Sequence, residues 1–345
     1  MRVFLRAVII FIIIFLGYTL YAQFGYYESE KRDGEDTNIS NEQLEEEKLV
    51  LPNDGILSLV GKSTVDIKKI IGEPNRIDPS AYDYDWWIYG NDPKQYVQIG
   101  VLNNKVVSAY GIGESLNADP FKIGQPIQEV FQIAPMSPSI SAEYRGNSYR
   151  FELSEEDMNT RPSVKFGNVY VQLYIDKFDG NLSSIRVMDE ETFIKQRSYE
   201  VIFRGELIEP EFVTADKWKE IEKGSEKQIF EITNMIRKRH QLETLQWEET
   251  VAQVAYLHSA DMKENNYFSH ESPTKGSLVN RLAEYKVNYE MAGENIAAQY
   301  VDGIAAVEGW LNSKGHREAL LNDEFTHLGV GVDELYYTQN FIKLR

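Results

Sequence analysis

The chain has 345 residues, 42% of them apolar, and its 36 basic and 54 acidic side chains give a formal net charge of −18. This length and composition predict folded domains, about two at roughly 100–200 residues each, and exclude a disordered protein. The acidic balance excludes the basic surface that nucleic-acid binding requires, so no nucleic-acid partner is expected. The absence of cysteine excludes disulfides, thiolate metal sites and cysteine nucleophiles.

The amino terminus has the features of a membrane anchor. Residues 7–27 carry no charge, two arginines precede them, and acidic residues follow. Such an apolar run crosses a bilayer as a helix, and the flanking charges place residues 1–6 in the cytoplasm. The membrane is therefore the expected partner of this single-pass anchor, with the later domains outside the cell. The alternative is a cleaved signal peptide and a secreted protein, although the large Leu20 fits a cleavage site poorly.

Residues 28–50 are polar and acidic, which predicts an extended tether that lifts the rest of the chain off the membrane. Residues 51–196 are predicted to form one domain with a weak internal repeat. Two helix-forming segments each precede a set of strand-like runs. The helices are expected at 61–74 and 124–131, and the runs at 86–89, 96–101 and 105–110, then at 148–153, 169–175 and 182–187. Two helix-plus-meander units would together form an α+β domain.

Residues 197–217 contain Pro210 and little periodicity, and they are predicted to be a linker. Helical spacing returns at 226–240 and 248–264, and each segment has one apolar stripe. His258 lies on the second stripe and is expected to be a hydrogen-bonded core residue.

The last third of the chain contains four short motifs in a fixed order. They are Tyr-Phe-Ser-His at 267–270, Gly-Glu-Asn-Ile at 293–296, Trp-Leu-Asn-Ser-Lys-Gly-His-Arg at 310–317 and Thr-His-Leu-Gly-Val-Gly-Val at 326–332. Residues 225–345 thereby resemble the bacterial branch of the CAP superfamily, which comprises the cysteine-rich secretory proteins, antigen 5 and the pathogenesis-related proteins. Residues 51–196 resemble, more loosely, the CAP-associated domain that precedes such modules in some Gram-positive, membrane-tethered proteins.

The resemblance implies an α/β/α CAP sandwich at residues 218–345, secreted or exposed at the surface, with a cleft lined by two histidines and two acidic residues. Matched motif by motif, His270 and His316 take the places of the two histidines, and Glu294 takes the place of the first glutamate. His327, beside the last motif, either lines the same cleft or caps the preceding loop.

The second acidic place departs from the family pattern. It lies three residues after Trp310, where this chain has Ser313. The nearest acid is Glu308, which lies two residues before Trp310 and should therefore leave the helix on another side. The departure puts in doubt any activity that needs two carboxylates.

The residue types leave three interpretations open, and no catalytic residue is assigned. His270, His316 and Glu294 are ligand types of an open divalent site, so a weakly bound metal such as zinc is the one cofactor considered. Alternatively, Glu294 deprotonates a water in a hydrolase. The third interpretation is a hydrogen-bonded network or a binding cleft. We favour a non-catalytic surface module for an envelope, lipid or protein ligand, with a metal-assisted hydrolase of peptide or cell-wall material as the alternative.

Overall fold

The structure is a computed structural model that describes residues 49–90 and 92–345. The predicted cytoplasmic segment 1–6, the predicted membrane span 7–27 and nearly all of the predicted tether 28–50 lie outside the described residues. Within the described part, no helix has both the length and the apolar character needed to cross a bilayer.

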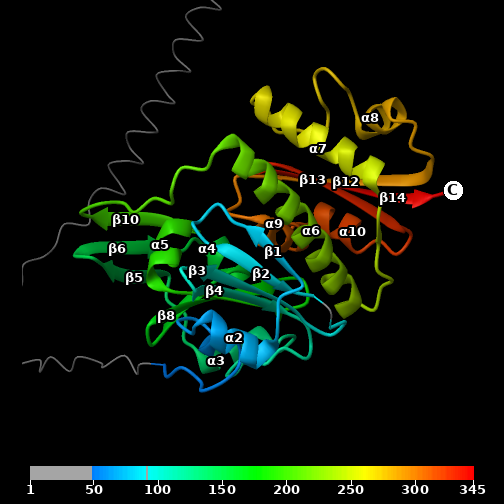
Figure 1. The fold of residues 1–345 in the computed structure, drawn as a ribbon. Helices are drawn as coiled ribbons and strands as arrows, with labels where there is room; N and C mark the ends of the chain where they lie inside the picture. Colours follow the sequence, from blue (N-terminus) through cyan, green and yellow to red (C-terminus); the bar gives the residue numbers. More distant parts are fainter. Residues whose placement is uncertain (1–48, 91) are drawn as a thin grey trace, which may run out of the picture. The chain divides into compact units, whose positions relative to one another are not determined.

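A seven-stranded sheet forms the centre of the N-terminal region, in the order β1-β2-β3-β4-β9-β8-β7 (Figure 1). All of its neighbouring strands are antiparallel. Nearly every residue of the central strands is buried, because helices and the second region cover both faces. The strands are β1 (Arg76–Pro79), β2 (Asp85–Tyr89), β3 (Tyr96–Leu102), β4 (Lys105–Ile112), β7 (Ser163–Phe166), β8 (Val169–Asp176) and β9 (Asn181–Met188).

The predicted internal repeat is visible in the backbone hydrogen bonds before the two helices, because equivalent residues of the two units make equivalent bonds. Before α2 (Thr64–Ile71), the amide of Gly61 donates to the carbonyl of Val106 in β4 at 2.8 Å. Before α3 (Ile127–Ile133), the amide of Gly124 donates to the carbonyl of Leu182 in β9, also at 2.8 Å. Because β4 and β9 pair with each other, most of both units lies in one sheet, and the predicted α+β class is confirmed. The second meander was wrong in one strand: the run predicted at 148–153 belongs to a separate, smaller sheet, because Ser163–Phe166 takes its place beside β8.

A smaller sheet, in the order β10-β6-β5, packs beside the first with α4 (Glu155–Thr160) and α5 (Glu190–Gln196). Its strands are β5 (Ser139–Tyr144), β6 (Asn147–Glu152) and β10 (Glu200–Arg204). The segment 197–217, predicted to be a linker, therefore contains a strand that pairs with β6. The short helix η1 (Ile56–Ser58) packs on β4.

The C-terminal region is a three-layer sandwich around a sheet in the order β11-β13-β14-β12. Figure 1 shows α7 and α8 on one face of this sheet and α6, α9 and α10 on the other. The predicted α/β/α arrangement is thus confirmed. The elements are α6 (Ala215–Arg239), β11 (Gln246–Trp247), α7 (Glu249–Glu264), α8 (Leu278–Glu284), β12 (Tyr289–Ala298), α9 (Gly303–Leu311), α10 (Lys314–Leu320), β13 (His327–Asp333) and β14 (Tyr336–Leu344).

The Gly-Val-Gly motif allows α7 to lie directly on β13. A Cβ atom on Gly329 would lie 2.1 Å from the backbone nitrogen of Ala252, and one on Gly331 would lie 1.8 Å from that of Tyr256. Real Cβ atoms do not approach backbone so closely, so only glycine permits this packing distance.

The two regions share one hydrophobic core. Trp86 and Tyr96 of the N-terminal sheet belong to the same buried cluster as Ile229 and Ile236 of α6. At the rim of this contact, the Arg76 guanidinium donates to both carboxylate oxygens of Glu231, at 2.8 and 2.9 Å. The N-terminal sheet therefore acts as part of the packing surface of the CAP-like sandwich.

Candidate functional site

The candidate site lies at β12, the edge strand of the C-terminal sheet. Glu294 and Asn295 are consecutive in β12, so their side chains point to opposite faces of the sheet. Glu294 pairs across the strands with Asn340 on the α7 face. The Asn295 amide donates to the carbonyl of His316 in α10 at 3.1 Å, on the other face. Side chains from both faces therefore meet around the free edge of β12, where the His270 and His316 ring centroids are 6.3 Å apart.

Glu294 is the anchor of this cluster, and its side chain is only 4% exposed. Its Oε1 lies 3.0 Å from Nδ1 of His270, and its Oε2 accepts a hydrogen bond from the Arg281 guanidinium in α8. With the amide of Asn340 oriented to satisfy its neighbours, the Asn340 nitrogen donates to the same Oε2 at 3.0 Å. Both carboxylate oxygens are thus engaged by donors from three separate elements.

His270 is held at one nitrogen and open at the other. It lies in the loop between α7 and α8, and its side chain is 57% exposed. When Nδ1 carries the proton and donates to Glu294, Nε2 is left as an acceptor. The loop itself is fixed because Arg281 also donates to the carbonyl oxygens of His270 and Gly276, each at 2.9 Å.

Two further imidazoles near Glu294 favour the neutral form. His258 is fully buried, its Nε2 lies 3.0 Å from the carbonyl oxygen of Ser269, and the same nitrogen lies 4.0 Å from Glu294 Oε1. Burial lowers the pKa of His258, although the negative charge of Glu294 opposes this shift. Burial, followed by repulsion from His270, lowers the pKa of His316. His258 is a hydrogen-bonded core residue, as its place on the apolar stripe predicts, and it also supports the cleft.

The other three residues considered from the sequence lie outside this network. Ser313 is the residue before α10 and makes no side-chain capping bond there. Glu308 leaves α9 toward the N-terminal region, where its Oε1 accepts from Ser184. His327 begins β13, two strands away from β12, and its Nδ1 lies 2.8 Å from Oγ1 of Thr326. The structure therefore brings together His270, Glu294 and His316 but not His327.

Arg281 and Asn340 complete the network but carry no signal in the sequence that assigns them to it. Arg281 lies in α8, outside the four motifs, and reaches Glu294 from a neighbouring helix. Asn340 contacts Glu294 only because the register of β12 and β14 places the two residues opposite each other. The Tyr-Tyr-Thr-Gln-Asn-Phe run at 336–341 marks the strand but does not indicate this contact.

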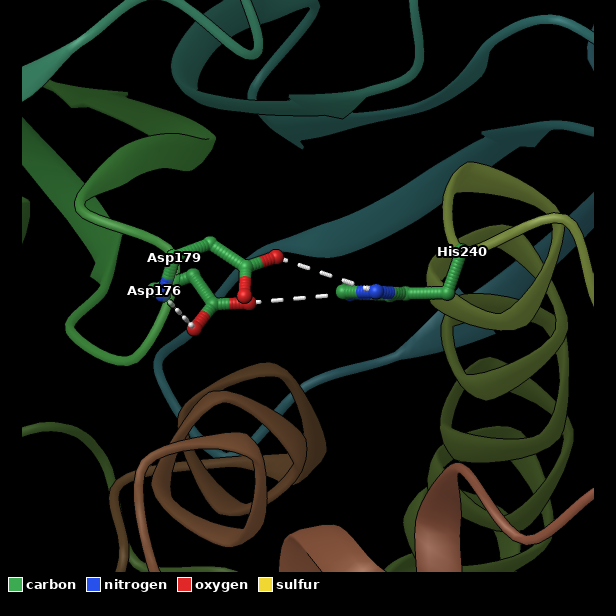
Figure 2. A group of neighbouring side chains, drawn as sticks. All are labelled: Asp176, Asp179 and His240. Carbon is green, nitrogen blue, oxygen red and sulfur yellow. Dashed lines mark hydrogen bonds and ion pairs between the residues drawn. The ribbon is translucent and has the colours of Figure 1, made fainter.

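A different group of potential metal ligands lies where the two regions meet. Asp176 ends β8, Asp179 lies in the β8–β9 turn and His240 follows α6, and each offers a ligand atom within 4.8 Å of the others. Figure 2 shows the imidazole directed toward the two carboxylates. Its Nε2 is 3.6 Å from Asp176 Oδ2, and its Nδ1 is 3.7 Å from Asp179 Oδ2. One ring thus presents a different nitrogen to each carboxylate, at distances longer than a hydrogen bond, so its two nitrogens do not converge on one shared position.

The charges of this cluster are already compensated. Arg317 of α10 donates to both carboxylate oxygens of Asp176 at 2.8 Å and to Asp179 at 2.9 Å. Although burial opposes ionisation, the neighbouring His240 ring and the hydrogen bonds from Arg317 lower the pKa of Asp176 to about 2. We therefore interpret the cluster as an ion-pair network that fastens α6 and α10 to the β8–β9 turn.

Comparisons with known proteins agree with this architecture. Residues 60–199 match the CAP-associated N-terminal family, and residues 230–342 match the cysteine-rich secretory protein family. The uncharacterised membrane protein YlbC of Bacillus subtilis is 57% identical over 344 residues, which cover 99% of both chains. The uncharacterised protein YkwD of the same organism is 44% identical over 119 residues, 34% of this chain and 46% of YkwD.

Two solved structures are similar over most of the chain. One is an extracellular protein with an SCP domain from Bacillus anthracis, with a TM-score of 0.81, 45% identity, and coverage of 92% of this chain and 99% of the other. The second is a cysteine-rich secretory protein from Staphylococcus aureus, with a TM-score of 0.77, 26% identity, and coverage of 86% and 97%.

Proposed function

This chain belongs to the cysteine-rich secretory protein (CAP) family, and on that premise we propose that it is a non-catalytic binding module of the cell surface. Its cleft, between His270 and His316, takes an envelope, lipid or protein ligand. The chain is anchored by residues 7–27, with both folded regions outside the cell. The uncharged sequence of that segment supports this placement, as do a relative named a membrane protein and another described as extracellular.

The non-catalytic proposal rests on Glu294, because both of its carboxylate oxygens already accept hydrogen bonds. A general base needs a carboxylate oxygen that a water can reach, and the Glu294 side chain is only 4% exposed. Here Oε1 is paired with His270, and Oε2 is paired with Arg281 and Asn340. The family's other acidic place is Ser313 in this chain, and Glu308, the nearest acid in sequence, is turned toward the other region. Glu294 therefore acts as the support that orients His270.

The groups left accessible suit recognition. His270 offers a free Nε2, and the half-buried His316 ring has its centroid 6.3 Å from that of His270. Two residues before His270 in the chain, Phe268 is 55% exposed, and it offers an apolar surface on the same loop. A surface with hydrogen-bonding groups next to an aromatic ring binds ligands that present both polar and apolar parts.

The alternative is a metal-assisted hydrolase, and one feature favours it. A histidine that ligates a metal commonly donates its other ring nitrogen to a carboxylate, as His270 does to Glu294. Nε2 of His270 and the neutral imidazole of His316 would then hold the ion, with Glu294 supporting rather than ligating. When bound, zinc would supply a polarised water. Two protein ligands are fewer than the three usual in catalytic zinc sites, so the residues fit only weak binding.

The experiment measures ligand binding and hydrolysis together. We expect the protein to co-sediment with purified cell wall or with lipid vesicles, and to release no product from wall or casein. His270→Ala and His316→Ala should reduce sedimentation, whereas the matched control His327→Ala should not, because His327 lies two strands away.

Hydrolysis by the wild-type protein that is lost in a folded Glu294→Gln variant would overturn the proposal in favour of the enzyme. Because Glu294→Gln also removes the negative charge that pairs with Arg281, a loss of folding would leave its result ambiguous, and His270→Ala therefore serves as a second variant. It removes only an exposed ring and should leave the fold intact. A large increase in thermal stability with zinc, reversed by chelator and absent in His270→Ala, would identify a metal site.

A further inference from the structure

The smaller sheet of the N-terminal region ends in a strand with a free edge. β10 is the last strand in the order β10-β6-β5, and each of its five residues pairs with β6 (Figure 1). Within residues 49–90 and 92–345, no group outside β6 is hydrogen-bonded to the backbone of 200–204. An edge of this kind presents unpaired N–H and C=O groups, so it can accept a strand from another chain.

The opposite edge of the same sheet is already engaged by side chains. On β5, the carbonyl of Ser141 accepts from the hydroxyl of Tyr170 at 3.1 Å, and the amide of Glu143 donates to the Glu190 carboxylate at 3.3 Å. The backbone of β10 makes no such contact with the described residues. A strand that extends the small sheet is therefore expected at β10 rather than at β5.

The side chains of β10 offer apolar surface on both sides of the sheet. Ile202 is 56% exposed and Phe203 is 45% exposed, and as consecutive residues of a strand they point to opposite faces. Val201 lies on the face of Phe203 and packs against the core beneath this sheet. Glu200 and Arg204, at the two ends of the strand, are exposed on the face of Ile202.

The sequence of β10, Glu-Val-Ile-Phe-Arg, is complementary to itself in the antiparallel direction. When Ile202 of one copy lies opposite Ile202 of a second copy, Glu200 lies opposite Arg204, and Val201 lies opposite Phe203. Every opposed pair then joins unlike charges or two apolar side chains, which stabilises strand pairing. A two-fold axis at Ile202 makes each unlike pair twice and closes the assembly at two chains. A parallel pairing in the same register would instead place like charges opposite each other.

Within one chain, the charges at the ends of β10 are not compensated. Glu200 lies opposite Glu152 of β6, and Glu152 already pairs with Arg150. Arg204 lies opposite the uncharged Ser148. Neither Glu200 nor Arg204 forms an ion pair with a described residue. Because like charges directly opposite each other destabilise a sheet, Arg204 of a second copy would relieve the repulsion at Glu200.

We propose that β10 is a dimerisation edge, at which a second copy of this chain extends the small sheet. The two three-stranded sheets then form one continuous sheet across the two-fold axis. A five-residue contact is far smaller than a standard protein interface, so the dimer should be weak and concentration-dependent. Its formation does not depend on the cleft or on the function proposed for the cleft.

Disulfide trapping on the purified full chain tests this interface. The chain contains no cysteine, so each cross-link comes from an introduced residue. Directly opposed residues of antiparallel strands have Cα atoms about 4.5–5.5 Å apart, a distance that a disulfide spans. We expect Ile202→Cys to form a product of two chains under mild oxidation with copper–phenanthroline. The matched control is Ile77→Cys, because Ile77 also lies on an edge strand, β1, and is 54% exposed.

The register is tested with Glu200→Cys and Arg204→Cys, both at exposed positions. Either variant alone would have its two cysteines four residues apart along the paired strands, about 14 Å, which is too far for a disulfide. A mixture of the two variants should cross-link, because position 200 of one copy lies opposite position 204 of the other.

The charges are tested on the Ile202→Cys background. Arg204→Glu should slow cross-linking about tenfold, because the two-fold axis repeats the lost pair. The further change Glu200→Arg exchanges the charges and should restore the rate. The proposal would be overturned if Ile202→Cys cross-links no faster than Ile77→Cys, if Glu200→Cys alone cross-links as fast as the mixture, or if the charge changes have no effect. In membranes of the producing cells, a disulfide from Ile202→Cys to a different protein, without the product of two chains, would also overturn it.

Discussion

Asp176→Asn tests how much the ion-pair network between the two regions contributes to stability. The Asp176 side chain is 2% exposed, and its pKa is lowered from 3.8 to about 2. A shift of this size corresponds to about 2 kcal/mol of stability at neutral pH. Removing one partner of a buried ion pair costs about 3–5 kcal/mol, but Arg317 keeps a second partner in Asp179 at 2.9 Å. We therefore expect Asp176→Asn to lower the free energy of unfolding by about 2–3 kcal/mol, closer to the value from the pKa shift than to the value for a broken buried pair.

Urea unfolding of residues 47–345, followed by tryptophan fluorescence, measures this loss. With a slope of about 3 kcal/mol/M, the midpoint should fall by roughly 0.7–1 M. The control is Asp179→Asn, whose side chain is 42% exposed and whose ion pair should contribute no more than about 1 kcal/mol.

The difference in stability between the wild type and Asp176→Asn should depend on pH, and this dependence tests whether the charge of Asp176 is its cause. The pKa of Asp176 is lower in the folded protein than in the unfolded chain. Its contribution is therefore complete above pH 3.8 and is lost as the pH falls through about 2. The gap between wild type and Asp176→Asn should be constant from neutral pH down to about 5, and it should narrow below about 4. Equal stability at neutral pH, or a gap that persists at low pH, would refute the assigned role.

Three further predictions concern the cleft, the domains and the membrane. Burial lowers the pKa of His258 from 6.5, so the unfolded chain binds more protons than the folded protein, and stability should decrease as the pH falls below 6.5. In His258→Gln, the melting temperature should change less between pH 7 and 5 than in the wild type. The fragment 217–345 should unfold cooperatively but at a lower temperature than residues 47–345, because the side chains of α6 in the shared core become exposed; equal melting temperatures would show that this contact adds no stability. Proteinase added to intact, wall-stripped cells should remove everything after about residue 28, and full protection of the C-terminal region would contradict the proposed topology.

Helices and strands were predictable where one periodic pattern extends over a buried face. The segments 96–101 and 105–110 became β3 and β4, and 248–264 became α7. The start of α6 was not predicted, because Ala215 lies eleven residues before the expected position and the first turns are mostly polar and exposed. β10 was missed for a related reason. It is an exposed edge strand whose partner, β6, lies about fifty residues earlier in the chain.

The candidate site was also predictable from the sequence only in part. The motifs predict His270, Glu294 and His316 because each lies inside a short string of fixed order, and the structure places them around the edge of β12. Local sequence cannot predict the contacts of Glu294 with Arg281 and Asn340, since they depend on helix placement and strand register. These contacts nevertheless support the proposal that the site is non-catalytic, because together with His270 they engage both carboxylate oxygens of Glu294.

The Trp-Leu-Asn-Ser-Lys-Gly-His-Arg motif connects the cleft with the N-terminal region. The Asn312 side chain accepts from the amide of Lys177 at 2.9 Å and donates to the carbonyl of Ile175 at 2.7 Å, at the end of β8. Arg317, five residues later, binds the carboxylates of the β8–β9 turn. Both contacts hold the α9–α10 junction, and His316 lies between them on the side of the cleft. The position of one cleft histidine is thus set by the N-terminal sheet, which gives a physical reason for the two regions to occur in one chain.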